Sequence, residues 1–264
     1  MKPSLSVLII GGGDLASGIA HVLFSCGMQV IITELPEPRM VRRTVCFGSA
    51  IYDGSIEIEC VKAIKTDKIE NIYLEFIPVI VDSELKLLDI YNPEIIIDAR
   101  MLKQEQPDIR NLAKLTIGIG PGFTVGKNVH RVVETKRGID LGRVYTNGSA
   151  LPDTGIPGII GGKGSERVLR APTSGILKNY LQIGDIVKEG EKIAQVGIEG
   201  VFAAFDGIIR GIAHEGLFVF EGEKIGDIDP RSDTDCYKIS DKARAIGGGV
   251  LSAIFSYFKW ELLI

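Results

Sequence analysis

Apolar residues in this sequence gather in short continuous runs that alternate with polar, glycine-rich segments. Runs such as Ser6–Ile10, Leu115–Ile119 and residues 76–81 have the length of strands, and their unbroken apolarity is typical of strands buried on both faces of a parallel sheet. From 14 to 26 apolar residues recur at helical spacing, and Gly27 ends the helix. We therefore predict that the chain opens with a strand, a helix and a second strand over 29–33.

The turn between the first strand and the helix fits G-x-G-x-x-A, a small-residue variant of the dinucleotide fingerprint: Gly11, Gly12, Gly13, Asp14, Leu15 and Ala16. In such a turn Gly11 permits the tight bend, and Gly13 lets backbone N–H groups approach a pyrophosphate. Glu34 lies 23 residues after Gly11, where a carboxylate accepts the ribose 2′-hydroxyl. These residues predict a Rossmann-type nucleotide site. The alternative is that the glycines only pack the helix against the strand.

Later strands end in further candidate ligand groups. Asp98 follows the run 94–97 and precedes Arg100; binding and purely structural roles are equally compatible with this pair. Asp82 is better explained as a helix N-cap. Gly120 and Gly122 belong to a glycine-rich segment, 118–126, that is typical either of an anion-cradling turn or of a simple turn. We include Asp98, Arg100 and both glycines among the predicted cofactor-binding residues.

An internal repeat marks a second unit. A shift of 32 residues aligns 171–193 with 203–225 without a gap, and ten of the 23 positions are identical. Neither half can bury its apolar face alone, so we expect the halves to interlock. The phrases at 170–176 and 183–190 resemble the biotinyl/lipoyl β-sandwich, whose carrier members attach their cofactor to a lysine in the hairpin between the halves. No lysine occurs from 194 to 222. We therefore expect no covalent biotin or lipoate, and a role in contacts.

The predicted fold class is α/β. It comprises a Rossmann-like parallel sheet unit over 1–165, a biotinyl/lipoyl-like β-sandwich module over 166–232 and a C-terminal helical segment over 233–264. Ser240 is a good N-cap for that last helix. Three consecutive glycines, 247–249, would cost it about 1 kcal/mol each relative to alanine. Either another backbone or a ligand approaches closely there, or the helix breaks.

Composition narrows the function classes. The chain has 264 residues, 45% of them hydrophobic, which suffices for a sizeable core. A net charge of −4 gives no attraction to nucleic acid or anionic membrane. No apolar run approaches the ~20 residues of a membrane span, and residues 1–4 lead directly into a strand without room for a signal peptide. Four scattered cysteines indicate a reducing compartment and no metal site. We expect a cytoplasmic protein.

Eight phrases together resemble the YqeB-type proteins of selenium-dependent molybdenum hydroxylase systems: 11–20, 42–45, 98–101, 120–123, 133–138, 167–172, 225–231 and 240–250. The resemblance spans nearly the whole chain. Members are regarded as accessory or maturation proteins, which implies a role in preparing a molybdenum hydroxylase. The resemblance does not carry over any catalytic residue.

Three functions are compatible with these observations. The first is an accessory protein that binds NAD or another nucleotide, including a molybdopterin dinucleotide, at the glycine turn. The second is an NAD-dependent oxidoreductase, for which Asp98 or His130 would have to be the general acid or base. The third is a non-catalytic scaffold with a degenerate nucleotide site. The expected partners are a molybdenum hydroxylase client and further copies of this chain in a homo-oligomer, with neither nucleic acid nor membrane.

Overall fold

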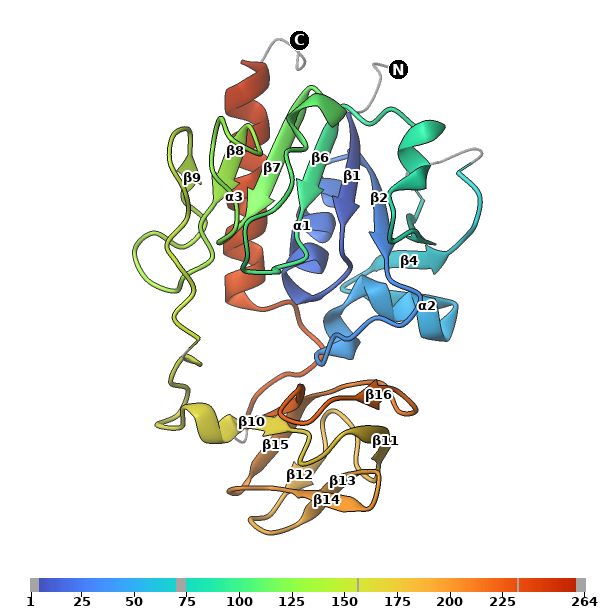
Figure 1. Cartoon of the computed structure of the whole chain (residues 1–264), viewed down its shortest axis with the longest axis vertical. Helices are drawn as coiled ribbons and strands as arrows, with labels where there is room; N and C mark the ends of the chain where they lie inside the picture. Colours follow the sequence, from blue (N-terminus) through green and yellow to red (C-terminus); the bar gives the residue numbers. More distant parts are fainter. Residues whose placement is uncertain (1–4, 70–74, 156, 232, 260–264) are drawn as a thin grey trace. The chain divides into compact units, whose positions relative to one another are not determined.

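The computed structural model describes residues 5–69, 75–155, 157–231 and 233–259. The chain forms two compact units: Met1–Pro38, Cys46–Thr154 and Ile239–Ile264 make the first, and Arg39–Val45 and Gly155–Lys238 the second (Figure 1). The sequence-based boundaries are 165/166 and 232/233, whereas this division falls at Thr154/Gly155 and at Lys238/Ile239, and the C-terminal segment from Ile239 belongs to the first unit. Residues 1–4, on which the exclusion of a signal peptide depends, lie outside the described residues.

A nine-stranded sheet in the order β3-β4-β5-β2-β1-β6-β7-β8-β9 forms the centre of the first unit. The strands from β4 to β8 in this order run parallel, and the edge pairs β3·β4 and β8·β9 are antiparallel. The bounds are β1 (Ser6–Ile10), β2 (Gln29–Glu34), β3 (Ser55–Ile58), β4 (Val61–Lys65), β5 (Ile77–Val81), β6 (Ile95–Asp98), β7 (Leu115–Ile119), β8 (Arg131–Val133) and β9 (Val144–Tyr145).

The central strands are buried on both faces, which explains their unbroken apolarity. Val7 and Ile9 point into a core that includes residues of α1 (Asp14–Ser25) and α3 (Asp241–Phe258). Leu8 and Ile10 point into a second core on the other face. There the cover consists of loops with the 3₁₀ turns η3 (Lys86–Asp89) and η4 (Arg110–Leu112). The remaining short helices within the described residues are η1 (Arg43–Val45), η2 (Phe47–Ser49), α2 (Ala50–Asp53) and η5 (Ser165–Arg167).

Helix α3 runs without a break through its three glycines. A Cβ added to Gly247 would lie 2.8 Å from Val22 Cγ2 on α1, and one added to Gly249 would overlap the carbonyl oxygen of Gly142. Gly248 has no neighbouring atom within 4 Å. Close approach of other backbone therefore accounts for two of the three glycines, and the predicted alternative of a broken helix is wrong. The Ser240 hydroxyl accepts the Ala243 amide at 3.1 Å, which confirms the predicted N-cap.

The second unit contains two four-stranded antiparallel sheets, ordered β10-β17-β15-β12 and β14-β13-β11-β16. Their strands are β10 (Val168–Arg170), β11 (Gly175–Asn179), β12 (Ile186–Val187), β13 (Lys192–Val196), β14 (Glu199–Phe202), β15 (Gly207–Ile212), β16 (Phe218–Val219) and β17 (Lys224–Asp229). The 32-residue shift maps β10–β13 onto β14–β17. Because β12 pairs with β15 and β16 pairs with β11, the two halves interlock as predicted.

The fold class predicted from the sequence is wrong. A Rossmann-like unit is a parallel sheet with helical crossovers, whereas this sheet is mixed, and among the described residues only α1 is a full helix between two adjacent parallel strands. The later connections contain Pro93 and Pro107 and form 3₁₀ turns or loops, because proline interrupts helices. The second unit is described by its two antiparallel sheets, and the biotinyl/lipoyl assignment is not retained. Helix α3 covers the first sheet and is not a separate segment.

Candidate functional site

Four adjacent parallel strands of the first unit bring their carboxyl ends to one edge. These strands are β1, β6, β7 and β8, and they are followed by Gly11, Ala99, Gly120 and Glu134. In open α/β sheets ligands bind at this edge. The N-termini of α1 and α3 lie beside the same strands. Most sequence-predicted site residues therefore belong to one edge of the sheet.

The predicted glycine turn is already occupied by protein groups. The Gly12 amide donates to Glu34 Oε2 at 2.6 Å, and the Gly12 carbonyl accepts from Ser17 Oγ at 3.1 Å and from the Gly48 amide at 2.9 Å. A Cβ on Gly12 would lie 2.7 Å from Gly48 Cα, so η2 stands where a pyrophosphate would approach. The other Glu34 oxygen accepts the Leu35 amide at 2.7 Å. Nucleotide binding through this turn is not supported.

The other residues of the predicted fingerprint lie in two kinds of environment: some pack into the hydrophobic core and others lie at the carboxyl edge of the sheet. Gly11 has a φ of +94°, so its turn needs a glycine. Leu15 packs against the hydrophobic core. Gly13 has no atom within 4 Å of an added Cβ, and half-buried Asp14 begins α1. The open side of the turn is thus at Gly13.

Asp98 and Arg100 satisfy one another. Asp98 is 1% exposed and accepts Arg100 Nε at 3.0 Å and Arg100 Nη2 at 2.5 Å, while Arg100 also reaches Gln106 at 3.3 Å. The hydrogen bonds that Arg100 donates to the Asp98 carboxylate raise the pKa of Arg100. The same Asp-x-Arg arrangement, with the arginine Nε on the aspartate two residues before it, occurs three times: Asp98/Arg100, Asp108/Arg110 and Asp229/Arg231. The pair therefore has a structural explanation independent of any ligand.

Sequence reasoning missed Glu134, a fully buried carboxylate at the end of β8. Its oxygens accept the amides of Thr135 at 2.7 Å, Lys136 at 2.8 Å and Leu151 at 2.8 Å. Glu134 thereby holds the loop after β8, through Thr135 and Lys136, against the segment that follows β9, through Leu151. A lone glutamate in an alternating strand pattern carries no signal of this role.

Sequence reasoning also missed Lys242, in the first turn of α3. Burial lowers the pKa of Lys242 and the charge of Arg137 lowers it further, while Asp14, Glu134 and Asp153 partly offset both. No described residue lies within hydrogen-bond or ion-pair distance of its ammonium. A cation in the first turn also opposes the helix dipole, and this position in the sequence was the available signal. Such a lysine suits contact with an anion or proton transfer.

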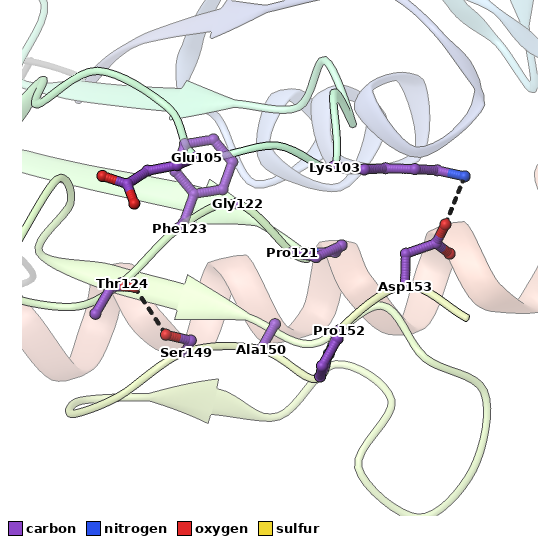
Figure 2. Close-up of a pocket in the computed structure, with 10 residues that line it drawn as sticks. All are labelled: Lys103, Glu105, Pro121, Gly122, Phe123, Thr124, Ser149, Ala150, Pro152 and Asp153. Carbon is purple, nitrogen blue, oxygen red and sulfur yellow. Dashed lines mark hydrogen bonds and ion pairs between the residues drawn. The ribbon is translucent and has the colours of Figure 1, made fainter. Parts of the chain in front are cut away.

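An open cavity of about 510 Å³ lies next to this edge (Figure 2). Its lining includes Gly122 and the ion pair between Lys103 and Asp153, at 2.9 Å. Gly120 has φ +76° and lies against the Thr135 hydroxyl, and Gly122 has φ +97° and lies against the Gln104 carbonyl. Turn geometry and close packing therefore explain both predicted glycines, and only Gly122 lines the cavity.

His130 does not join this edge. It immediately precedes β8, so it lies at the amino end of the parallel strands, opposite to Asp98. Its Nδ1 accepts the Thr116 amide at 3.1 Å. Burial, followed by the charges of Arg110 and Arg131, lowers the pKa of His130. The two acid–base candidates of the oxidoreductase hypothesis thus lie at opposite edges of the sheet.

Two searches confined to the described residues were negative. No group of three or more His, Cys, Asp or Glu side chains there could hold a metal ion. No helix in the same residues has the length and apolarity to span a membrane.

Comparison with known proteins gives weak structural and strong sequence similarity. No protein-family model matches the chain. An aspartoacylase family protein from Mesorhizobium loti is 10% identical with a TM-score of 0.29, covering 87% of each chain. The apo structure of the ectoine utilization protein EutE (DoeB) from Ruegeria pomeroyi is 8% identical with a TM-score of 0.26, covering 85% of this chain and 86% of that one. With TM-scores this low, we infer neither fold nor activity from these structures.

The similarity in sequence extends over nearly the whole chain but only part of the relative. The chain spans about half the length of the curated relative it matches, 49%. That relative is the "Uncharacterized protein YqeB" of Escherichia coli (strain K12), to which 96% of this chain aligns at 46% identity over 264 residues.

Proposed function

We propose that the chain is an accessory protein of a molybdenum hydroxylase system, and that it binds a phosphate-bearing cofactor at the carboxyl edge of β1, β6, β7 and β8. The cofactor class is a nucleotide or a molybdopterin dinucleotide. The observation that carries the binding site is Lys242, a half-buried ammonium without a partner among the described residues, near an open cavity. The hydroxylase role rests on the sequence motifs.

The sequence motifs that resemble the YqeB-type proteins also support a ligand site at the carboxyl edge of β1, β6, β7 and β8. Of the eight phrases that resemble the YqeB-type proteins, five adjoin this edge: 11–20, 98–101, 120–123, 133–138 and 240–250. They come from five separate parts of the chain and meet only in the folded first unit. A shared ligand site is a direct physical reason for such a set of motifs to lie together.

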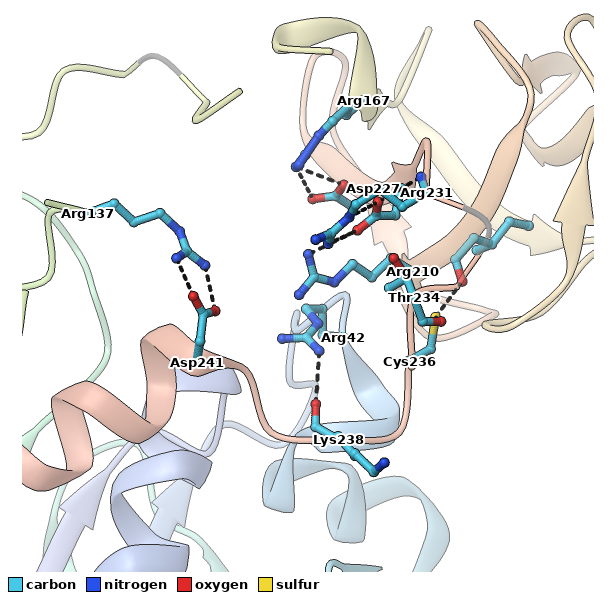
Figure 3. Close-up of polar contacts among 12 residues, drawn as sticks. Arg42, Arg137, Arg167, Arg210, Asp227, Arg231, Thr234, Cys236, Lys238 and Asp241 are labelled. Atoms are coloured by element: carbon cyan, nitrogen blue, oxygen red, sulfur yellow. Dashed lines mark hydrogen bonds and ion pairs between the residues drawn. The ribbon is translucent and has the colours of Figure 1, made fainter. Parts of the chain in front are cut away.

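The charges around the edge leave Lys242 as the group best placed to meet a phosphate. Asp153 is neutralised by Lys103 at 2.9 Å, and Glu134 spreads its charge over three backbone amides. Asp241 is engaged by both terminal nitrogens of Arg137, at 2.7 and 2.9 Å (Figure 3). A phosphate at Lys242 would favour the charged form of this half-buried ammonium, because a nearby anion opposes the lowering of its pKa by burial.

The oxidoreductase hypothesis has less support from this geometry. Asp98 is bound on both oxygens by Arg100, and His130 lies at the other edge. Neither side chain is placed to exchange a proton with a substrate in the cavity. A scaffold without a ligand is the remaining alternative, and a binding experiment separates it from our proposal.

The binding test is calorimetric titration of the intact chain with NAD, ATP, CTP and molybdopterin cytosine dinucleotide. We expect at least one to bind, and Lys242→Gln to weaken it at least tenfold, about 1.4 kcal/mol. The matched control is Lys114→Gln, because Lys114 is an exposed lysine paired with Glu94 at the amino end of β7; it should change the affinity less than twofold. If no ligand binds better than millimolar, or if both variants bind alike, the proposed site is wrong.

The accessory role has a separate test in the cell. A molybdenum hydroxylase purified from a host that lacks this chain should contain normal amounts of polypeptide but little bound cofactor, measured as molybdenum per protein. Complementation with the wild-type chain should restore the cofactor content, and the Lys242→Gln variant should restore it only partly. Full cofactor content in the host without the chain would contradict the accessory role while leaving the binding result intact.

A further inference from the structure

In the second unit (Figure 1), the sheet β14-β13-β11-β16 has exposed apolar side chains on one face. Leu177 of β11 pairs with Val196 of β13, and both are fully buried, so they mark the inner face. Successive side chains of a strand point to opposite faces, and the outer face therefore comprises Ile176, Lys178, Tyr180, Lys192, Phe202 and Phe218. Ile176 and Phe202 are 54% exposed, Phe218 47% and Tyr180 45%. A group of large apolar side chains exposed on one face is typical of an interaction surface.

The outer face has its positive charge in the centre and apolar groups at both edges. The ammonium groups of Lys178 and Lys192 lie 5.5 and 4.7 Å from the centre of the Tyr180 ring. In the strand order, Phe202 belongs to the edge strand β14 and Phe218 to the edge strand β16, while both lysines lie on the two strands between them. A partner that fits this face therefore needs apolar groups on either side of acidic ones.

In the counterpart sheet, β10-β17-β15-β12, polypeptide already covers the equivalent strands. The 32-residue shift maps β11 and β13 onto β15 and β17, which are buried along most of their length; Ile208, the counterpart of Ile176, is 7% exposed. Two segments of the same unit, 39–45 and 231–238, contact β15. A Cβ on Gly211 would lie 2.9 Å from the Val41 carbonyl oxygen, and Cys236 Sγ lies 3.7 Å from a carbonyl oxygen of β15. A polypeptide segment is therefore a suitable cover for a sheet of this design.

The lysines of the outer face lack the acidic partners that their counterparts have. Each equivalent cation of the other sheet meets an aspartate of β17: Arg210 with Asp229 at 3.3 Å, and Lys224 with Asp227 at 3.4 Å. The same shift places Gly197 and Gln195 at the positions of these two aspartates. Within the described part of the chain, no carboxylate lies within ion-pair distance of Lys178 or Lys192. An acidic group would thus complement this face.

Two other occupants fit the face less well. A second copy of the chain, placed face to face about a two-fold axis, would bring Lys178 and Lys192 against the same lysines of its partner. Single-stranded nucleic acid needs free aromatic rings for base stacking. Here the Tyr180 ring already contacts two ammonium groups, and the Phe218 ring packs edge-on against Phe220 with 5.4 Å between the ring centres.

We propose that the outer face is a docking surface for a segment of a partner protein that carries acidic residues flanked by apolar ones. Its aromatic side chains would supply the apolar anchors, and the two lysines would attract and orient the acidic residues. The surface belongs to the second unit and does not depend on Lys242 or on the ligand of the first unit.

The test is a selection of short random peptides, displayed on phage, on the immobilised whole chain. Peptides that also bind the double variant Ile176→Ser/Phe202→Ser are removed by counter-selection, so that the remaining peptides report on the outer face. We expect the enriched peptides to combine Asp or Glu with Phe, Leu or Ile, and to bind the wild-type chain with a Kd below about 100 µM by fluorescence anisotropy. Lys178→Glu should weaken this binding at least tenfold, and added salt should weaken it as well.

Two exposed residues outside the outer face provide matched controls. Ile186→Ser changes the counterpart of Phe218, which is 71% exposed in β12, and Lys62→Glu changes an exposed lysine of β4; both should keep the peptide affinity within twofold. If the double variant does not fold by circular dichroism, Lys178→Glu replaces it in the counter-selection and Lys192→Glu in the affinity test.

Three results would overturn the proposal. One is that no acidic peptide survives the counter-selection, or that the survivors bind Lys178→Glu as tightly as the wild type. Another is a wild-type dimer in sedimentation that Phe202→Ser converts to a monomer, because a second copy would then be the occupant. The third is displacement of the enriched peptide by a single-stranded oligonucleotide, which would identify the face as a nucleic-acid surface.

Discussion

Two neighbouring glycines of α3 should respond in opposite ways to the same substitution. Gly248→Ala places a methyl group in open space and removes the propensity cost of a mid-helix glycine, so we expect stabilisation by about 1 kcal/mol. Gly249→Ala gains the same propensity term, but its methyl would overlap the Gly142 carbonyl oxygen and lie 3.0 Å from Val133 Cγ1. Overpacking against backbone costs about 1–3 kcal/mol or more, so we expect net destabilisation by about 2 kcal/mol.

The gap between the two variants is therefore about 3 kcal/mol. Urea unfolding measures it, with a probe specific to the first unit because the chain has two units and can unfold in two steps. For an m-value of about 2 kcal/mol/M the midpoints should differ by about 1.5 M. Equal midpoints would mean that helix propensity decides both positions. A destabilised Gly248→Ala would refute the inferred helix packing altogether.

Three further outcomes follow from the charged groups. Burial raises the pKa of Asp229, but hydrogen bonds from Arg231 outweigh it and lower the pKa from 3.8 to about 2. The Asp229 carboxylate should thus contribute about 2 kcal/mol to the free energy of unfolding above pH 4, and this contribution should be lost as the pH falls toward 2. In urea unfolding, the stabilities of Asp229→Asn and of the wild type should therefore converge near pH 2. A difference that stays constant with pH would contradict this prediction. Burial and Arg137 lower the pKa of Lys242 from 10.5, so its labelling by an amine reagent, followed by peptide mass spectrometry, should reach its plateau below pH 10.5. Glu134→Gln should lower the free energy of unfolding of the first unit, measured in urea, by about 2–4 kcal/mol, because hydrogen bonds from backbone amides to a charged carboxylate are lost. A decrease of less than about 0.5 kcal/mol would show that the loop after β8 rearranges to compensate.

The strands that are buried on both faces could be predicted because continuous apolarity is a local property. The run Leu115–Ile119 is β7 without a shift, and residues 14–26 differ from α1 by one residue. The fold class could not be read in the same way. The Rossmann interpretation assumed that the later strands would also be joined by helices. The mixed edges and the return of α3 to the first sheet arise from contacts between residues far apart in the sequence.

The candidate site shows the same limit. The fingerprint Gly11–Ala16 was correctly placed between a strand and a helix, yet nothing in it indicates that η2 would be bonded to the Gly12 carbonyl. Lys242 and Glu134 were overlooked because the importance of each depends on burial and on groups far away in the sequence: the charge of Glu134, 108 residues before Lys242, acts on the pKa of that lysine, and Glu134 itself accepts the amide of Leu151. Asp82 was predicted to be a helix N-cap; its carboxylate accepts the amides of Lys86 and Leu87 at 3.0 and 2.8 Å, in the first turn of η3, but the N-cap position itself is Leu85.

The pairing of the repeat halves has an evolutionary consequence. Each of the two sheets contains strands from both halves, and every strand of one half has a 32-residue counterpart at the equivalent place in the other sheet. Two identical short chains, each carrying one half, can therefore make every one of these pairings between themselves as a symmetric dimer. Duplication and fusion of such a gene converts that dimer into a tandem monomer without a new strand contact. The second unit thus has the internal order expected of a dimer that became a single chain.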